Sequence, residues 1–408
     1  MQKFQTFTGK QYLQIDIANS FGLDNVTWDE RLAWFKKHEN NLMDCLSLAK
    51  DPAAFYAGVQ AWEAVQRGEP IGHTISLDAT SSGLQILAAL TGDRAAAELC
   101  NVVDYKGERR DGYTVIYNDM LARLSNLGID AGGITRDDTK SAIMTGLYGS
   151  QAVPKEVFGE GIQLQVFYES MGTLAPAAWE LNMAFLNMWD PDALSHDWVL
   201  PDNFHVHVKV MDTVQETVQF LNQPYDTFRS VNQPTEEGRS LGANTTHSID
   251  GMIVREISRR CNYDVDKVLK VMEAAVHPSK GGLGIGRPDD EMVKTLWGHF
   301  ERTGYLSARI LDHLDLGNMG LVDQEEILDL INSLPEKPFT VLSVHDCFRC
   351  LPNYGNDLRQ QYNLQLSMIA RSTLLQDLLS QICKRQLSIG KLDHNMWKDV
   401  LHTNYALS

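Results

Sequence analysis

The sequence predicts an α+β protein that is mostly helical. Apolar residues recur at helical spacing over most of 10–66, 160–190 and 262–334, whereas short runs of alternating apolar residues occur at 73–79 and 339–352. Of the 408 residues, 43% are hydrophobic, which is enough for sizeable cores in two or three domains of about 150 residues each. No internal repeat or low-complexity linker is visible, so we expect these domains to be interwoven along the chain.

The first strongly periodic helix is predicted within 28–49. Four apolar residues there recur at helical intervals: Leu32, Phe35, Leu42 and Leu46. Asp29 stands just before them, and aspartate is a preferred N-cap residue. We therefore expect this helix to be capped by Asp29.

A strand, an acidic residue, a turn and a helix follow one another over 73–92. The run HTISLDA is a short strand that ends close to Asp78, and TSSG makes a tight turn. The apolar segment LQILAALTGD then predicts a helix that stops at Gly92.

The segment TRDDTKSAIMTGLYGS, residues 135–150, predicts a capped helix. Thr135 is the expected N-cap with Asp138 as its capping-box partner, and Gly149 supplies the C-terminal stop. Four residues at intervals of four share one face: Arg136, Lys140, Met144 and Tyr148. Two long cationic groups and a phenol therefore point the same way.

Three later segments complete the expected elements. Residues 198–235 are β-rich, and FTVLSVHDCFRCLP, at 339–352, predicts a hairpin with His345 and Asp346 at its tip. The glycine-rich stretch 281–288 follows no strand and precedes no Lys-Ser/Thr pair, which favours a flexible loop over a phosphate-binding one.

The charge is strongly acidic and unevenly distributed. The 53 Asp and Glu against 36 Lys and Arg give a net charge of −17, which taken alone argues against a nucleic-acid-binding protein. Residues 151–250 hold 14 acidic and 4 basic groups, or −10 of that total, so a basic channel elsewhere remains compatible with the sum.

No membrane span or secretory signal is visible. Only Cys347 and Cys350 of the six cysteines are close in sequence, and we expect all six to be reduced.

Two carboxylates occupy positions that can meet on one sheet. Asp78 ends a strand and Asp346 lies in a hairpin turn, 268 positions later. If they meet, they can bind two Mg²⁺ ions about 4 Å apart, the arrangement that activates a 3′-hydroxyl and stabilises leaving pyrophosphate. Arg136 and Lys140 would hold a triphosphate, and Lys140 could protonate the leaving group.

These motifs resemble those of the single-subunit RNA polymerases of bacteriophages and mitochondria. SLDATSSGLQ is similar to motif A of that family, TRDDTKSAIMTGLYGS to motif B and SVHDCF to motif C. The similarity extends to KQYLQIDIANSFGLDNVTWDERLAWFKKHENNL, DGYTVIYNDML, ANTTHSIDG and the final NYALS, which stands where the family has a short aromatic foot. It covers most of 1–260 and 339–408.

The resemblance implies a role for each site residue. Asp78 and Asp346 are the implied metal ligands with the Ala79 carbonyl, and Lys140 is the implied catalytic lysine. The implied nucleotide contacts are Arg136 to the triphosphate, Tyr148 to the ribose, Tyr113 beside the nucleotide and His247 near the sugar and the primer end. Three positions depart from the family: Ala79 replaces a usual glycine, Ser141 a basic residue and Cys347 a serine. The second of these puts one phosphate contact in doubt.

The implied architecture is the palm and fingers of a right-handed polymerase, with the N-terminal domain and thumb absent from this chain. The expected parts are a helical palm-insertion-like segment (1–72), palm with motif A (73–92), fingers (93–247, with the motif B helix at 135–149 and a region like the specificity hairpin at 198–235), palm (248–260), an inserted helical module (261–338), and palm with motif C and foot (339–408). The chain thus resembles the larger, catalytic subunit of a heterodimeric phage RNA polymerase.

The implied partners follow from that reading. They are template DNA, nascent RNA, NTPs and a smaller subunit that supplies the missing N-terminal part, in the host cytoplasm and without a membrane. Residues 198–235 contain only Lys209 and Arg229 as basic groups. Duplex recognition depends on Lys and Arg, so we expect weak unaided promoter binding and a recruiting or single-stranded-DNA-binding factor.

Two alternatives remain open. A family-A DNA polymerase fragment shares the Asp, Lys-Tyr-Gly and His-Asp pattern, but such enzymes carry a glutamate where this chain has Gly83, and His-Asp-Glu where it has Cys347 after Asp346. Without a side chain at Gly83 a ribose fits, and Tyr148 can hydrogen-bond near its 2′-hydroxyl. The other alternative is a non-catalytic accessory subunit whose aspartates are ordinary turn residues.

Overall fold

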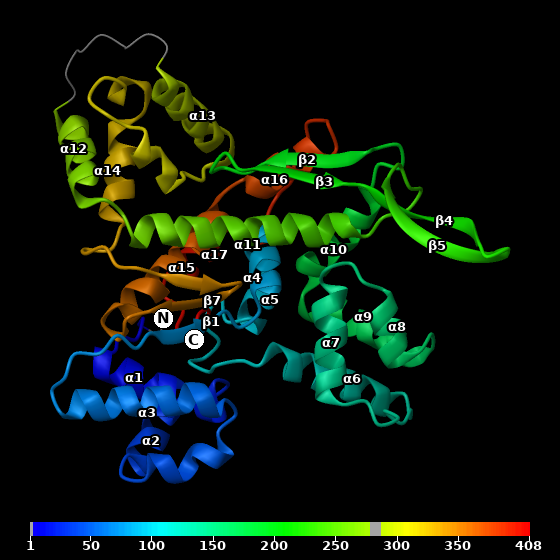
Figure 1. The fold of residues 1–408 in the computed structure, drawn as a ribbon, viewed down its shortest axis with the longest axis horizontal. Coiled ribbons are helices and arrows are strands. Elements are labelled where there is room, and N and C mark those ends of the chain that lie inside the picture. The colour runs from blue at the N-terminus through cyan, green and yellow to red at the C-terminus, as the bar shows by residue number, and fades with distance from the viewer. Residues whose placement is uncertain (1–2, 278–286) are drawn as a thin grey trace.

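A small antiparallel sheet lies near the centre of the molecule, close to both ends of the chain (Figure 1). The computed structural model describes residues 3–277 and 287–408. The sheet has three strands in the order β1 (Ile75–Asp78), β7 (Cys347–Cys350) and β6 (Leu342–Val344). The chain end extends it on the free side of β1, where Ala79 bridges to Leu407. The strand predicted at 73–79 and the hairpin predicted at 339–352 are both confirmed.

Three helices pack together behind this sheet and form the main core. They are α4 (Ser82–Thr91), α11 (Ser240–Cys261) and α15 (Gly355–Arg371). Every residue of α4 from Gly83 onward is buried, as its continuous apolar sequence predicts, and Gly92 ends the helix in a left-handed conformation with φ of 66°. α16 (Leu374–Ile382) and α17 (Met396–Val400) complete this region.

The N-terminal helices form a separate layer with its own core of Phe35, Phe55, Val59 and Trp62. It contains α1 (Gly9–Ala18), α2 (Trp28–His38) and α3 (Pro52–Gln66), with a π-helical turn at Asn19–Leu23 and a 3₁₀ turn at Leu42–Leu48.

The predicted cap of α2 is wrong. The N-cap is Thr27, which accepts a hydrogen bond from the Glu30 amide while the Glu30 carboxylate accepts one from the Thr27 amide. Asp29 lies inside the first turn. The Thr27–Glu30 pair satisfies two amide groups at once, whereas a cap at Asp29 would leave Trp28 outside the helix.

A second helical group lies to one side of the sheet. It comprises α5 (Arg94–Leu99), α6 (Gly112–Asn126), α7 (Arg136–Gly146), α8 (Ala152–Phe158), α9 (Ile162–Leu174) and α10 (Pro176–Asn187). The helices predicted at 135–149 and 160–190 are confirmed. α10 packs against α4 and thereby joins this group to the central core.

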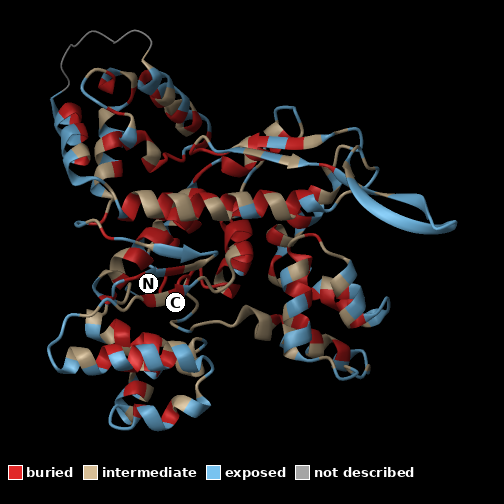
Figure 2. Cartoon of the chain, in the orientation of Figure 1, coloured by how far each residue is buried: buried red, intermediate tan, exposed pale blue. Residues whose placement is uncertain are grey.

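Two hairpins form the β-rich region predicted at 198–235. β2 (Ser195–Val199) pairs with β3 (His205–Lys209), and β4 (Met211–Phe220) pairs with β5 (Gln223–Asn232). The β4–β5 hairpin projects away from the body and is exposed along most of its length (Figure 2).

The segment predicted as an inserted module has a core of its own, which includes Val271, Val293, Ile310 and Ile327. α12 (Val265–Val276), α13 (Pro288–Thr303) and α14 (Gln324–Asn332) surround it, with 3₁₀ turns at Ala308–Asp312 and Met319–Leu321. Of the glycine-rich stretch 281–288, all but the last two residues lie outside the described residues. None of the described helices combines the length and apolar character that a membrane crossing requires.

Candidate active site

Two carboxylates that are far apart in the sequence meet at one end of the sheet. Asp78 ends β1 and lies opposite Cys347, the first residue of β7. His345 and Asp346 form the turn between β6 and β7, and His345 reverses the chain with φ of 56°. The Ala79 amide donates a 3.1 Å hydrogen bond to the Asp346 carbonyl oxygen and ties this turn to the end of β1.

The charge at this end of the sheet is suited to a bound cation. Burial raises the pKa of Asp78, a hydrogen bond with the Cys347 thiol opposes that shift, and the charge of Asp346 raises the pKa further. Among residues 3–277 and 287–408 no group of three or more His, Cys, Asp or Glu side chains is placed to hold a metal. Mg²⁺ needs few protein ligands when phosphates supply the rest, so the two carboxylates and the adjacent Ala79 carbonyl are a donor set that fits it.

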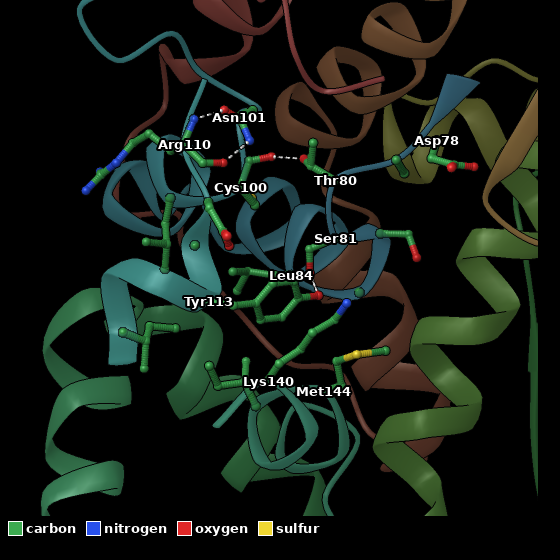
Figure 3. Close-up of a pocket in the computed structure, with 18 of the residues that line it drawn as sticks. Asp78, Thr80, Ser81, Leu84, Cys100, Asn101, Arg110, Tyr113, Lys140 and Met144 are labelled. Atoms are coloured by element: carbon green, nitrogen blue, oxygen red, sulfur yellow. Dashed lines mark hydrogen bonds between the residues drawn. The ribbon is translucent and has the colours of Figure 1, made fainter. Parts of the chain in front are cut away.

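A cavity of about 430 Å³ opens beside these carboxylates (Figure 3). The residues predicted for the site line it, except His247: Asp78, Ala79, Tyr113, Arg136, Lys140, Tyr148 and Asp346. They come from the sheet, from α6 and from the helix α7 with the turn that follows it. The fold therefore brings Asp346 together with a carboxylate and cations that lie more than two hundred positions earlier in the sequence.

Helix α7 presents the predicted face to the cavity. Thr135 accepts a hydrogen bond from the Asp138 amide, and Asp138 accepts one from the Thr135 amide, so the predicted capping box is present. Arg136, Lys140 and Met144 line the cavity together with Tyr148, which follows in the turn after the helix. Gly149 takes φ of 85°, which fits its predicted role in ending the helical segment.

The two predicted cations of α7 differ in their partners. Arg136 pairs with the Asp111 carboxylate, donates a 2.9 Å hydrogen bond to the Thr114 hydroxyl and also contacts Asp137. The hydrogen bond to Asp111 raises the pKa of Arg136. Lys140 has no carboxylate within ion-pair distance in the described chain, and its Nζ lies 5.3 Å from the centre of the Tyr113 ring. Of these two cations, Lys140 is thus the one more available to bind a ligand.

Tyr148 is held between a glycine and a histidine. A Cβ at Gly83 would lie 2.6 Å from the Tyr148 hydroxyl oxygen, so the absence of a side chain there permits the close approach. The Tyr148 and His247 rings lie 4.7 Å apart between centroids, which places His247 next to the cavity although it does not line it. Burial, with Asp250 as the next cause, raises the pKa of Tyr148 to about 12, so its hydroxyl stays protonated and can donate.

Sequence reasoning missed two charged residues near the site. Asp250 lies on α11, and burial together with Asp346 raises its pKa to about 6. Its position three residues after His247, on the same helix face, was the available signal. Arg109 also lines the cavity, and the pair Arg109–Arg110 immediately before the helix that carries Tyr113 was the signal for it.

Part of this chain is similar in sequence to known RNA polymerases. Residues 5–157 match the family described as DNA-dependent RNA polymerase. The DNA-directed RNA polymerase of Pseudomonas phage phiKMV is 27% identical over 172 residues, which are 35% of this chain and 21% of that protein. The mitochondrial DNA-directed RNA polymerase of Neurospora crassa is 28% identical over 166 residues, 35% of this chain and 12% of that protein. A probable DNA-directed RNA polymerase of Neurospora crassa is 27% identical over 160 residues, 35% of this chain and 18% of that protein.

The matched family segment contains Asp78, Tyr113, Arg136, Lys140 and Tyr148, whereas His247 and Asp346 lie beyond it. This chain covers only about a fifth of the phage relative and less of the fungal ones. Over residues 5–157, the chain is thus similar to the DNA-dependent RNA polymerases of phages and mitochondria.

Proposed function

We propose that this chain is the catalytic subunit of a phage-type RNA polymerase and that it transfers nucleotides from NTPs to RNA on a DNA template. The observation that carries the proposal is the meeting of Asp78 and Asp346 at one cavity with Lys140 and Tyr148. Within the described residues neither the two carboxylates nor Lys140 has an ion-pair partner, although all three line one cavity, and an accessory subunit would have no need for such an arrangement. The match over 5–157 supports the same reaction.

The chemistry assigns a role to each side chain. Two Mg²⁺ ions held by Asp78, Asp346 and the Ala79 carbonyl would activate the 3′-hydroxyl of the RNA and stabilise the charge on the leaving pyrophosphate. The 3′-hydroxyl gives its proton to solvent, and its oxygen bonds to the α-phosphorus while the bond from that phosphorus to the bridging oxygen of pyrophosphate breaks. Lys140 donates its proton to the departing pyrophosphate, and Arg136 binds the phosphate oxygens.

Ribonucleotides are the proposed substrates. The Tyr148 hydroxyl lies against Gly83, where no side chain blocks a 2′-hydroxyl. A protonated phenol at this place can donate to or accept from that group, which DNA lacks. Tyr113 lies next to Lys140 and is the proposed neighbour of the nucleotide. His247 lies next to Tyr148 and is the proposed contact near the sugar and the primer end.

The proposed division of the chain is palm (73–92, 248–260 and 339–408) and fingers (93–247). The border at 247/248 falls inside α11, a continuous helix from Ser240 to Cys261, so the two parts share this helix. A smaller subunit is proposed to supply the N-terminal domain and thumb. A separate recruiting or single-stranded-DNA-binding factor is proposed to open the promoter.

The test is RNA synthesis by the chain co-expressed with a candidate small subunit, on a single-stranded DNA template with Mg²⁺ and NTPs. Asp78→Asn and Asp346→Asn are each expected to abolish synthesis, because each removes a carboxylate ligand. Asp44→Asn is the matched control, since Asp44 is an exposed carboxylate of the N-terminal layer. Synthesis that survives either active-site substitution would refute the catalytic assignment and favour an accessory subunit.

A further inference from the structure

We propose that Arg109 is a third cation of the nucleotide site, which binds phosphate oxygens of the incoming triphosphate and of the product pyrophosphate. This inference rests on the proposed function and adds a substrate contact to it. Arg109 lines the same cavity as Asp78 and Lys140, but it belongs to the segment between α5 and α6. It therefore reaches the site from a different element than the two cations of α7.

Arg109 is placed beside the catalytic end of the sheet. Its Nε donates to the Ser408 hydroxyl at 3.5 Å, a long contact. Ser408 in turn pairs with Asp78 through its main chain, with a 2.9 Å hydrogen bond from its amide to the Asp78 carbonyl oxygen. This pairing occupies the edge of β1 that β7 leaves free, so Arg109 lies on the opposite side of Asp78 from Asp346.

The guanidinium of Arg109 lacks a carboxylate partner among the residues that the structure describes. The acids nearest to it are engaged elsewhere: Asp24 pairs with Lys50 at 3.4 Å, and Asp111 pairs with Arg136. Arg31 lies close enough for the two positive charges to repel each other. A guanidinium has five N–H donors, and removing it from water without an anion costs free energy.

The surrounding loop holds this charge in position. Asn101 and Arg110 exchange two hydrogen bonds, from the Arg110 amide at 2.8 Å and to the Arg110 carbonyl oxygen at 2.9 Å (Figure 3). The Arg110 guanidinium stacks over the Tyr105 ring at 4.2 Å. Arg110 also lines the cavity, but its guanidinium is engaged by the Tyr105 ring, whereas Arg109 has no such partner on its own loop.

Phosphate is the anion that the proposed reaction brings to this cavity. The triphosphate is highly charged, and of the two cations on α7 the charge of Arg136 is already balanced by Asp111. Arg109 adds a second cation without a carboxylate partner among the described residues to the cavity that Lys140 lines, and a guanidinium can bind two phosphate oxygens in parallel. The same chemistry would suit a phosphodiester of the RNA, so the experiment must separate these two sources.

The experiment uses the assembled polymerase and compares Arg109→Gln with Arg385→Gln, an exposed arginine outside the cavity. Steady-state RNA synthesis gives kcat and the KM for NTP, and pyrophosphorolysis gives the KM for pyrophosphate. Loss of a charge-assisted hydrogen bond is expected to raise both KM values about tenfold or more in Arg109→Gln. Arg109→Lys is expected to show a smaller rise in both KM values, because lysine keeps the positive charge but lacks the two parallel N–H donors of a guanidinium.

Each outcome decides the proposal. Unchanged KM values for NTP and pyrophosphate would overturn it, and weaker primer–template binding in their place would assign Arg109 to the RNA backbone. If Arg109→Gln does not fold, the several-fold rise in both KM values expected for Arg109→Lys remains the test. RNA synthesis that is normal in Arg109→Gln but lost in Asp78→Asn would refute this inference alone, whereas synthesis that survives Asp78→Asn would refute the proposed function.

Discussion

Gly83 and Tyr148 show how a missing side chain sets the position of a functional one. The Tyr148 hydroxyl oxygen would be 2.6 Å from a Cβ at Gly83, closer than any carbon–oxygen contact can be without movement. Gly83 lies on the buried helix α4, and Tyr148 follows α7. Because α4 cannot shift in its packed core, the tyrosine would have to yield.

Gly83→Ala is therefore expected to displace Tyr148 and to reduce discrimination between NTPs and dNTPs. Tyr148→Phe is expected to reduce the same discrimination about tenfold while RNA synthesis continues, because only a hydrogen bond is lost. The measurement is the ratio of kcat/KM for an NTP to that for its dNTP. Equal use of dNTPs by the unmodified protein, together with no effect of Tyr148→Phe, would favour a DNA polymerase.

At the scale of elements, α7 is the support for both Lys140 and Tyr148. Its N-terminus depends on Thr135, whose hydroxyl accepts from the Asp138 amide and donates to the Asp138 carboxylate. Replacing a threonine N-cap by alanine costs about 1 kcal/mol of helix stability.

Thr135→Ala is expected to destabilise α7 locally by about 1 kcal/mol, with faster amide hydrogen exchange in its first turns. Thr135→Ser keeps the hydroxyl and is the matched control, expected to behave like the unmodified protein. The same exchange rates in Thr135→Ala and in the unmodified protein would show that tertiary packing, rather than the cap, holds this helix.

The resemblance connects residues 198–235, which include the β4–β5 hairpin, to promoter reading. The one arginine of this hairpin, Arg229, pairs with Glu216 at 2.7 Å, and Asp212 and Asp226 add to the acidic surface. Lys209, at the end of β3, is the remaining basic group of 198–235. Few free cations therefore face any DNA that this hairpin would meet.

The assembled polymerase is accordingly expected to bind linear duplex promoter DNA weakly when no further factor is present. The reason is that phosphate contacts by Lys and Arg supply most of the affinity for duplex DNA. Fluorescence anisotropy at 50 and 200 mM salt, on promoter and scrambled duplexes, is the measurement. Tight and specific binding without a further factor would contradict this expectation.

The elements that sequence predicted correctly are those with local signals. The strand at 73–79, the capped helix at 135–149 and the turn at Asp346 all follow from a few neighbouring residues. The predicted cap at Asp29 is wrong because Thr27, two residues earlier, forms a capping box with Glu30 that the prediction did not consider.

The parts that sequence could not predict depend on distant partners. Arg109 lies near Asp78 through its contact with Ser408, which is 299 positions away in the sequence. The pairing of Arg136 with Asp111 depends on how α6 packs against α7. Asp250 faces the site because α11 crosses behind the sheet. No local pattern encodes such contacts, so these residues needed the structure.

At the scale of the whole molecule, one buried ionic network holds three parts together. Asp202, in the connection between β2 and β3, is fully buried and pairs with Arg255 and Arg259 of α11 at 2.6 and 2.9 Å. Its carbonyl oxygen accepts a 2.9 Å hydrogen bond from Arg309 of the inserted module. The module is further tied to α11 by Glu256, which accepts hydrogen bonds from Ser307 and from the Ala308 amide.

Asp202→Asn tests how far this network determines global stability. Burial alone would raise the pKa of Asp202, but the hydrogen bonds and charges of Arg255 and Arg259 outweigh it, and the pKa lies below its ordinary value. A carboxylate whose pKa is lowered on folding contributes its full stability above the pKa of the unfolded chain, about 3.9, and loses it as the pH falls through the lower folded value.

The substitution leaves Arg255 without its carboxylate and Arg259 with Glu256 alone, and it is expected to cost about 3 kcal/mol near pH 7. The difference in melting temperature between the unmodified protein and Asp202→Asn should be constant from pH 8 to 5 and should shrink from about pH 4 toward pH 3, because the unmodified protein alone loses the carboxylate. Asp44→Asn, at an exposed site, should match the unmodified protein throughout. A difference that grows toward acid pH would mean that the pKa of Asp202 is raised rather than lowered, and that burial outweighs the two arginines.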